Sequence, residues 1–322
     1  MADNMILHKD SKSFQAAINI ASDKLGILPE FIEKDYWITV ILKRLFESNY
    51  NEDVVFKGGT SLSKGYRLID RFSEDVDIAV LNVSEISGNK IKNLIRDVEK
   101  SISIDLTEIE NHPMSSKGSR FRKAFYKYNR LGDSRLYQTI SDNIIIEINS
   151  FANPFPYEKK EINSLIGISL AMNNQLDLLR KYELLPFKIN VLDKRQTLNE
   201  KLVSLLRFSF EDNPVDGISG KIRHFYDLHF LLRDKDCKLY IESPEFKKRL
   251  DEIWQHDQLT FNEPENWKGK TVNESVLYSN TVEMWDKVKE VYKKELSALA
   301  FKTIPDNEEV LKSFLKIMSA CV

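Results

Sequence analysis

Two aspartates separated by one apolar residue, Asp75 and Asp77, come at the start of a short apolar segment that ends at Val80. Successive side chains of a β-strand point to opposite faces, so an extended segment places both carboxylates on one face. Two ionised carboxylates so close together repel each other unless cations lie beside them. Mg²⁺ suits such a site, because it accepts carboxylate and phosphate oxygens together. Most Asp-x-Asp pairs are solvated surface, but the apolar strand that follows this pair favours a metal site.

A pair of glycines, Gly58 and Gly59, lies upstream, between an apolar segment at residues 54–56 and a helix-compatible stretch. Glycine lets backbone N–H groups come close to a ligand, and a helix beginning there favours phosphate. Thr60 and Ser61 add hydroxyl donors and are good N-cap residues. A glycine pair before a helix fits an ordinary turn equally well. Together with the two aspartates, it predicts a cradle for a triphosphate.

A third carboxylate, Glu147, stands in the middle of the β-branched segment IIIEI at residues 144–148. Burying a carboxylate in an apolar strand is unfavourable unless it is paired or bound to metal. Beside Asp75 and Asp77 it would complete a triad able to hold two metal ions, one activating an attacking hydroxyl and one steadying a leaving pyrophosphate. The alternative is that this face of the strand is simply open to solvent.

A sheet and its flanking helices must position these residues. Concentrations of β-branched and aromatic residues predict strands at residues 54–56, 76–80, 121–128 and 144–148. Apolar residues that recur at three to four positions, just after Pro29, predict a helix over 31–46. Residues 62–69 and 89–101 are also helix-compatible.

The second half of the chain is predicted to be mainly helical. The segment NPFP at residues 153–156 interrupts the strand pattern and is expected to end the sheet domain. Beyond it, helices are predicted at residues 164–172, 197–210, 219–232, 244–254, 274–297 and 307–318. The predicted fold class is α+β, with a sheet domain at residues 1–160 and a helical domain at 161–322.

The motifs GGTSLSK at residues 58–64 and RFSEDVDI at 71–78 resemble those of the AbiEii-type nucleotidyltransferase toxins. That family includes the mycobacterial MenT toxins and belongs to the DNA polymerase β-like nucleotidyltransferase superfamily. The segment EKDYWIT at residues 33–39 resembles the family's N-terminal helix. The gap from Gly59 to Asp75 is longer than in many superfamily members and resembles this family's own spacing. The resemblance covers about residues 33–232.

Two later motifs extend the resemblance. Lys201 lies on the apolar face of its predicted helix, where a lysine usually extends harmlessly to solvent. Arg223 and Asp227 are four residues apart in RHFYDL, and by default form an exposed ion pair. The resemblance instead implies that all three belong to the nucleotide pocket, with Lys201 on the phosphates and Asp227 near the base, the ribose or an orienting lysine. The two residues before Tyr226 are His-Phe, where the family often has Lys-Asp.

The resemblance implies a bilobed enzyme with a small mixed sheet, whose helical domain completes the nucleotide pocket. It implies transfer of a nucleoside monophosphate from a nucleoside triphosphate to an acceptor, with Mg²⁺ or Mn²⁺ as cofactor. It also places Lys64 on the triphosphate as a catalytic point charge, where the sequence alone would indicate a solvated lysine. The expected role is the toxin of a type IV toxin–antitoxin or phage-defence pair with a cognate antitoxin. For some relatives the acceptor is the 3′ end of tRNA.

The segment KGSRFRKAFYKYNRLGDSR, at residues 117–135, concentrates basic and aromatic residues. It holds seven Lys or Arg residues and Asp133 as its only acid. Basic side chains contact phosphates and aromatic rings stack on unpaired bases, although a strand with aromatics inward and charges outward gives the same pattern. We expect the segment to guide an RNA acceptor through Arg120, Arg122, Lys123 and Lys127.

The composition narrows the class of protein. The 322 residues carry a formal net charge of −2, so any basic surface must be local. Two cysteines argue against a disulfide scaffold and a cysteine-based zinc site, and suit a reducing cytoplasm. The sequence shows no secretory signal and no run of about 20 apolar residues, so a cytoplasmic protein without a membrane partner is expected.

Two rival functions stay open from the sequence. One is nucleotide transfer to a protein side chain or a small molecule. The other is a non-catalytic nucleotide-binding or antitoxin-binding module on the same fold. Asp75 and Asp77 argue against the second, because a module without catalysis has no physical need for two carboxylates that repel each other.

Overall fold

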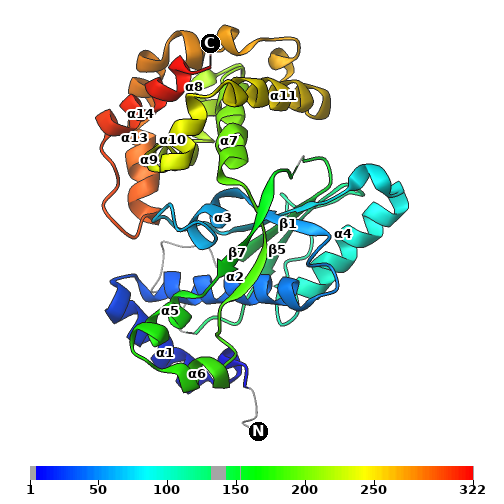
Figure 1. Cartoon of the computed structure of the whole chain (residues 1–322), viewed down its shortest axis with the longest axis vertical. Helices are drawn as coiled ribbons and strands as arrows, with labels where there is room; N and C mark the ends of the chain where they lie inside the picture. The colour runs from blue at the N-terminus through cyan, green and yellow to red at the C-terminus, as the bar shows by residue number, and fades with distance from the viewer. Residues whose placement is uncertain (1–4, 132–142, 153, 322) are drawn as a thin grey trace. The chain divides into compact units, whose positions relative to one another are not determined.

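The computed structural model describes residues 5–131, 143–152 and 154–321 of the chain. The chain forms two compact units. Unit 1 comprises Met1–Tyr66 and Phe72–Leu192, and unit 2 comprises Arg67–Arg71 and Asp193–Val322. Figure 1 traces the chain through both units. Within the described ranges, no helix combines the length and the apolar character that crossing a membrane requires.

Unit 1 is built on a mixed sheet, which has eight strands within the described ranges. The order is β3–β5–β6–β2–β1–β8–β7, with β4 paired to β5. β2 runs antiparallel to β1 and parallel to β6, and β8 runs parallel to β1. The strands are β1 (Val54–Lys57), β2 (Asp75–Val80), β3 (Thr107–Glu108), β4 (Ser116–Lys117), β5 (Phe121–Lys127), β6 (Asn143–Asn149), β7 (Tyr157–Ile162) and β8 (Phe187–Leu192).

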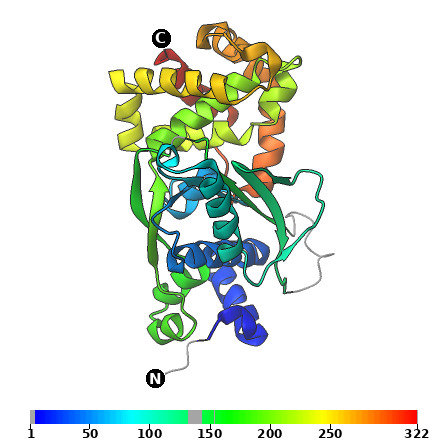
Figure 2. The ribbon, with the colours of Figure 1, turned by 90° about the vertical axis from the view of Figure 1, so that its right-hand side faces the viewer.

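Alternation of apolar and acidic residues gives the centre of the sheet two different faces. In β2, Val76 and Ile78 are fully buried, and in β6 Ile146 and Ile148 are buried in the same way. The residues between them are half-buried, so the acids of both strands share the other face. The apolar face is covered in part by α4 (Gly88–Ile102), which lies in front of the sheet in Figure 2.

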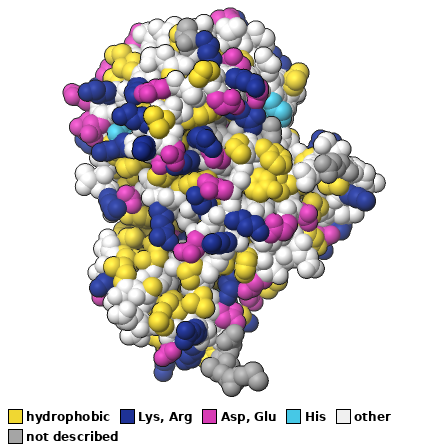
Figure 3. All heavy atoms as spheres, in the orientation of Figure 1, with side chains coloured by type: hydrophobic (Ala, Val, Ile, Leu, Met, Phe, Trp, Pro, Cys, Tyr) yellow, Lys and Arg dark blue, Asp and Glu magenta, His cyan; other side chains and the backbone are white. Residues whose placement is uncertain are grey.

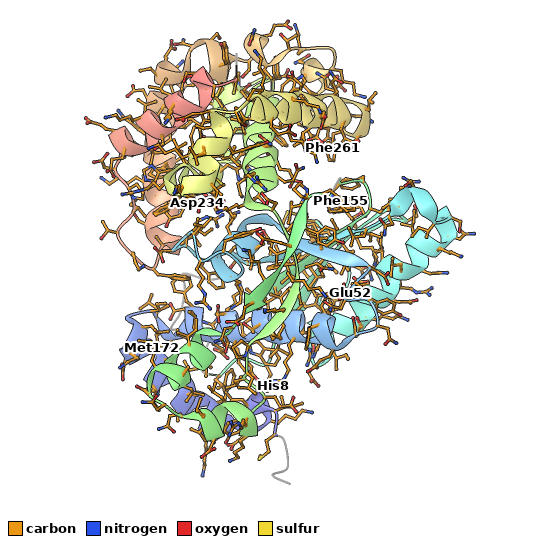
Figure 4. The ribbon with its side chains drawn as sticks, viewed as in Figure 1. His8, Glu52, Phe155, Met172, Asp234 and Phe261 are labelled. Atoms are coloured by element: carbon orange, nitrogen blue, oxygen red, sulfur yellow. The ribbon has the colours of Figure 1, made fainter. Side chains whose placement is uncertain are left out.

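The other helices of unit 1 are held by local sequence signals. α1 (Ser11–Leu25) begins where the Asp10 side chain accepts from the Ser13 N–H, and ends at Gly26 in the left-handed region. α2 (Pro29–Glu47) begins with proline at its first position. α5 (Leu165–Met172) and α6 (Leu176–Lys181) pack near α1, and Figure 4 labels His8 and Met172 in this group. The remaining helix, α3 (Gly58–Lys64), follows β1 directly.

Unit 2 is helical within the described residues. Helix α9 packs against α7, α10 and α14, and Asp234, labelled in Figure 4, caps α10 while pairing with Lys194 of α7 at 2.7 Å. The short segment Arg67–Arg71 joins this unit through a β-bridge between Arg71 and Ala300. The helices are α7 (Lys194–Phe208), α8 (Pro214–Ser219), α9 (Arg223–Arg233), α10 (Lys235–Ile241), α11 (Pro244–Thr260), α12 (Val276–Ser279), α13 (Thr281–Leu299) and α14 (Asn307–Ser319).

The predicted α+β class is confirmed, but the sheet is larger than expected. The prolines at 154 and 156 do not end it, because β7 and β8 follow them and pair with each other and with β1. The chain therefore divides after Leu192, where the sequence had suggested residue 160. Helix α3 also starts at Gly58 and ends at Lys64, whereas the sequence suggested residues 62–69.

Candidate active site

The glycine loop is a direct passage from strand to helix. β1 ends at Lys57, and Gly58 is already the first residue of α3, with φ of +80°. That φ lies in the left-handed region, which glycine adopts with least strain. A Cβ added to Gly58 would overlap the Asp77 carboxylate. Position 58 therefore needs glycine both for its backbone angle and for the close approach of the Asp77 side chain.

Two hydroxyl groups fix this loop to the acidic strand. Thr60 Oγ1 donates to the backbone oxygen of Asp75 at 2.5 Å, and Ser61 Oγ donates to the backbone oxygen of Gly58 at 2.8 Å. Both side chains are buried. Thr60 and Ser61, predicted to contact a nucleotide, thus act here within the protein and hold Gly58 and Gly59 beside β2.

The acids lie in a row of charged residues that crosses four strands. Lys57 of β1 is opposite Asp77 of β2, Asp77 is beside Glu147 of β6, and Glu147 is opposite Lys123 of β5. All four are half-buried, and Asp75 shares their face two residues along β2. Like charges side by side in a sheet destabilise each other, so lysines on both flanks favour the central acidic pair.

Glu147 already has a cationic neighbour. Lys123 Nζ lies 2.6 Å from Glu147 Oε1, and both side chains are about one-quarter exposed. Across the described ranges, no group of three or more His, Cys, Asp or Glu side chains has a metal-binding arrangement. The part of Glu147 in a metal triad therefore stays a prediction.

Asp75 and Asp77 nevertheless fit Mg²⁺. They offer hard oxygen donors on one accessible face, and the absence of a Cβ at Gly58 lets the Asp77 carboxylate lie directly against the glycine loop. Mg²⁺ is commonly bound by one or two carboxylates together with the phosphates of a substrate, and does not require a cage made entirely of protein. The two aspartates would therefore be the protein ligands of a metal that arrives with a nucleotide.

Lys64 lies in a buried ion pair. Its Nζ is 2.5 Å from Asp35 Oδ1 of α2, and its side chain is only 6% exposed. The sequence predicted a point charge directed at a triphosphate. In this structure the charge of Lys64 is compensated by Asp35, so its direct effect is on the position of α3.

Unit 2 contains a buried group of charges around Asp227, from the middle of α9. Arg71 donates to both carboxylate oxygens, at 2.7 and 2.6 Å, and Lys201 of α7 donates to one of them at 2.7 Å. Asp227 is fully buried, and both cations are nearly so. In place of an exposed pair with Arg223, Asp227 therefore orients Lys201 and anchors the segment that carries Arg71.

The two cations decide the ionisation of this group. Burial alone would raise the pKa of Asp227, but the charges of Arg71 and then Lys201 outweigh that effect and hold its pKa well below the usual range. Burial also lowers the pKa of His224 well below its usual range, and Lys201 lowers it further. Two cations thus share the single carboxylate of Asp227, with a neutral His224 beside them.

The basic segment at residues 117–135 carries less uncompensated charge than its sequence suggested, because several of its cations pair with acids. Lys117 pairs with Glu108 at 2.7 Å, Arg122 pairs with Glu99 of α4 at 2.6 Å, and Lys123 pairs with Glu147. Arg120 and Lys127 are exposed. Arg135, at the end of the segment, lies outside the described residues.

Sequence reasoning missed three contributors to these groups. Lys57 directly precedes the glycine pair and could have been noticed for that reason. Asp35 and Arg71 lie inside the motifs EKDYWIT and RFSEDVDI, but the sequence does not indicate their partners, because each meets its partner only in the folded chain. Their partners are 29 and 156 residues away.

Comparisons with known proteins identify the family to which the chain belongs. The sequence model of a family described as "Nucleotidyl transferase AbiEii toxin, Type IV TA system" matches residues 40–313. No curated protein sequence matches the chain. Among solved structures, MenT4, a nucleotidyltransferase toxin from Mycobacterium tuberculosis H37Rv, has a similar fold. The TM-score is 0.50 at 15% identity, over 95% of this chain and 97% of that one. Because the family match spans most of its length, this chain belongs to the AbiEii family of nucleotidyltransferase toxins of type IV toxin–antitoxin systems.

Proposed function

We propose that this toxin transfers a nucleoside monophosphate from a nucleoside triphosphate to RNA, with the 3′ end of tRNA as the acceptor and Mg²⁺ as cofactor, Mn²⁺ being the alternative metal. The observation that carries the proposal is the contact of a left-handed glycine at position 58 with the carboxylate of Asp77. A phosphate loop and a metal-binding carboxylate must lie close together to handle one triphosphate.

Each candidate site residue of unit 1 then has a definite role. Asp75 and Asp77 would hold the metal, with Glu147 as the proposed third acid. When bound, the metal neutralises the negative charge that develops on the phosphates during transfer. The backbone of Gly58 and Gly59 would cradle the triphosphate, and Thr60, Ser61 and Lys64 would keep the loop in place. Catalysis of this kind is mostly positioning and charge neutralisation.

Unit 2 would supply cationic contacts to the nucleotide. This part of the proposal is supported by Lys201, a nearly buried cation that shares the single carboxylate of Asp227 with Arg71. Arg223, half-buried at the start of α9, would add a second cation. Asp227 would act on Lys201 and not touch the nucleotide, because Arg71 and Lys201 already occupy its oxygens.

An RNA acceptor is supported by a small number of exposed cations. Arg120 and Lys127 lie at the two ends of β5 with their side chains exposed, and Arg122 and Lys123 would contribute less because they are paired. On the face drawn in Figure 3, basic and acidic side chains are interspersed, so charge alone does not predict tight RNA binding through that face.

The test of the site is transfer of label from each α-labelled nucleoside triphosphate to total RNA, with and without Mg²⁺. We expect labelled RNA of tRNA size from the wild type, and a loss on the order of 10²–10³-fold in Asp77→Asn. Full activity in Asp77→Asn would remove the proposed site. Label appearing in protein or in a small molecule would replace RNA as the acceptor.

A further inference from the structure

Three consecutive charged residues in the first half of α2 have side chains that are buried or largely buried. Glu33 is 3% exposed, Lys34 is fully buried, and the side chain of Asp35 is 13% exposed. Neighbouring residues of an α-helix point roughly 100° apart. Three in a row therefore point in three different directions, and a single partner segment would not cover all of them. Their burial needs a structural reason.

Each of these residues contacts a different segment around the candidate active site. Lys34 Nζ donates to Glu74 at 2.7 Å, and Glu74 directly precedes Asp75. Asp35 accepts from Lys64 at 2.5 Å through one oxygen, and from the N–H of Leu165 at 2.7 Å through the other.

Glu33 accepts from the N–H of Leu131 at 2.6 Å, just beyond β5. One rigid helix thus touches the start of the acidic strand, the helix behind the glycine loop, and the chain after the strand that carries Lys123.

Two further hydrogen bonds connect these anchor points to the acids. The backbone oxygen of Glu74 accepts from the N–H of Ile145 in β6 at 3.3 Å, and Thr60 of α3 donates to the backbone oxygen of Asp75. A shift of Glu74 would therefore move β2 against β6. A shift of Lys64 would move α3, and with it Gly58, against Asp77.

Stability alone does not account for a fully buried lysine at position 34. Replacing a buried ion pair by apolar side chains of similar volume is often neutral or stabilising. A leucine or methionine on α2 would fill the same space without loss of charge hydration. What an apolar residue would not do is fix the place of Glu74, since apolar contacts have no direction.

We infer that Lys34 and Asp35 are positioning residues of the nucleotidyltransferase reaction: Lys34 sets the place of the Asp75–Asp77 carboxylates through Glu74, and Asp35 sets the place of the glycine loop through Lys64. This inference rests on the proposed function, in which the loop holds the triphosphate and the carboxylates hold the metal. Neither residue touches the nucleotide.

The two adjacent residues should therefore give different kinetic signatures. In Lys34→Met the carboxylates move, and kcat should fall about 10–100-fold while KM for the nucleoside triphosphate changes little. In Asp35→Asn the amide oxygen still accepts from Leu165, but the charge facing Lys64 is lost. KM for the nucleoside triphosphate should rise about 10-fold with kcat nearly kept.

The matched control is Lys43→Met, on the same helix. Lys43 donates to the backbone oxygen of Glu183 at 2.7 Å and pairs with its carboxylate at 3.1 Å, and Glu183 lies in neither the glycine loop nor the acidic strand. This variant should keep the wild-type kcat and KM. If Lys34→Met and Asp35→Asn change the kinetics no more than Lys43→Met does, α2 has only a structural role and the inference is wrong.

A double variant keeps the test decisive if Lys34→Met folds poorly. Lys34→Met with Glu74→Leu removes both charges and should recover the melting temperature, because no unpaired carboxylate remains. Its kcat should stay low. Recovery of kcat together with the melting temperature would overturn the positioning role, and so would a lower KM in Asp35→Asn, which would mean that Asp35 competes with phosphate for Lys64.

Failure of the inference and failure of the proposed function give different results. An active Asp77→Asn variant removes the site itself, whatever α2 does. An inactive Asp77→Asn variant, together with Lys34→Met and Asp35→Asn variants that behave as Lys43→Met does, leaves the site in place and removes only the role of α2.

Discussion

The acids of unit 1 and the acid of unit 2 are in opposite situations. Asp75 and Asp77 are half-buried on an accessible face of the sheet, with a second carboxylate, Glu147, beside Asp77. Asp227 is fully buried and has cations on both of its oxygens. The first arrangement keeps negative charge where a cation can reach it. The second uses its negative charge to hold two side chains still.

This difference separates residues that act on a ligand from residues that act on other residues. A carboxylate that receives a metal must lie on an accessible face, whereas one that orients a lysine works best when it is buried against that lysine. In the sequence, Asp75, Asp77 and Asp227 all lie in motifs that resemble those of the same family. Their surroundings indicate two different roles.

Removing one carboxylate from each group should have very different effects on the free energy of unfolding. Asp227→Asn leaves Arg71 and Lys201 buried with too little negative charge, and should lower the free energy of unfolding by about 3–5 kcal/mol. Asp77→Asn, which removes one of two neighbouring acids, should change it by only about 1 kcal/mol or less. Urea unfolding of both variants measures this. Equal losses would mean that the comparison is mistaken.

Adding a methyl group at Gly58 and at Gly26 should distinguish overlap with the Asp77 carboxylate from backbone strain at a positive φ. Gly58→Ala places a Cβ against the Asp77 carboxylate and should lower nucleotide transfer about 100-fold. Gly26→Ala is the matched control, since Gly26 has a φ of +66° with open space around its Cβ position. It should lower stability by about 1 kcal/mol and leave transfer unchanged. Similar transfer by the two variants would show that overlap with the Asp77 carboxylate does not affect the site.

The buried aspartate should also give the unfolding free energy a distinct acid dependence. Because the folded-state pKa of Asp227 is lowered, its stabilising effect is complete above the pKa of the unfolded chain, near 3.9. That effect decreases as the pH falls below this value towards the folded-state pKa. Between about pH 5 and pH 3 the wild type should therefore lose more stability than Asp227→Asn does. Parallel losses in urea midpoints would contradict the ionised state assigned to Asp227.

The smallest expected effect concerns the acceptor. Charge reversal of the exposed residues, Arg120→Glu with Lys127→Glu, should weaken RNA transfer a few-fold and reduce its salt dependence, with nucleotide binding kept. Arg122→Glu should act differently, since it faces the buried Glu99 and should lower stability first. Unchanged RNA transfer in the double variant would remove the proposed RNA surface.

Local patterns predicted the parts of the fold that depend on near neighbours. Alternation placed Asp75 and Asp77 on one strand face. The apolar residues of 31–46 and the helix-compatible residues 89–101 predicted α2 and α4 within one or two residues of their ends. The strand β7 was missed because its sequence, YEKKEI, is almost entirely polar and is half-buried or exposed except at Ile162. Only its pairing with β8 makes it a strand.

The sequence predicted those parts of the site that lie within a single helix, strand or loop. The glycine loop, the aspartate pair and the half-buried Glu147 could be read from consecutive residues. The partners of Lys64 and Lys201 could not, because helix and strand periodicity says nothing about which element packs where. Both lysines were expected to meet phosphate directly, and the structure gives both a carboxylate partner first.

Because the five residues Arg67–Arg71 belong to unit 2, dividing the chain at one position does not separate the two units. The chain leaves unit 1 after Tyr66, returns at Phe72, and leaves again after Leu192. A fragment ending at Leu192 would carry Arg71 without Asp227, and would lose the hydrogen bond from the Phe301 N–H to the Asp70 oxygen. The complementary fragment would contain Asp227 with Lys201 alone. Expression of either half by itself should therefore give an aggregation-prone product, and swapping helical halves between relatives requires this pentapeptide to be exchanged as well.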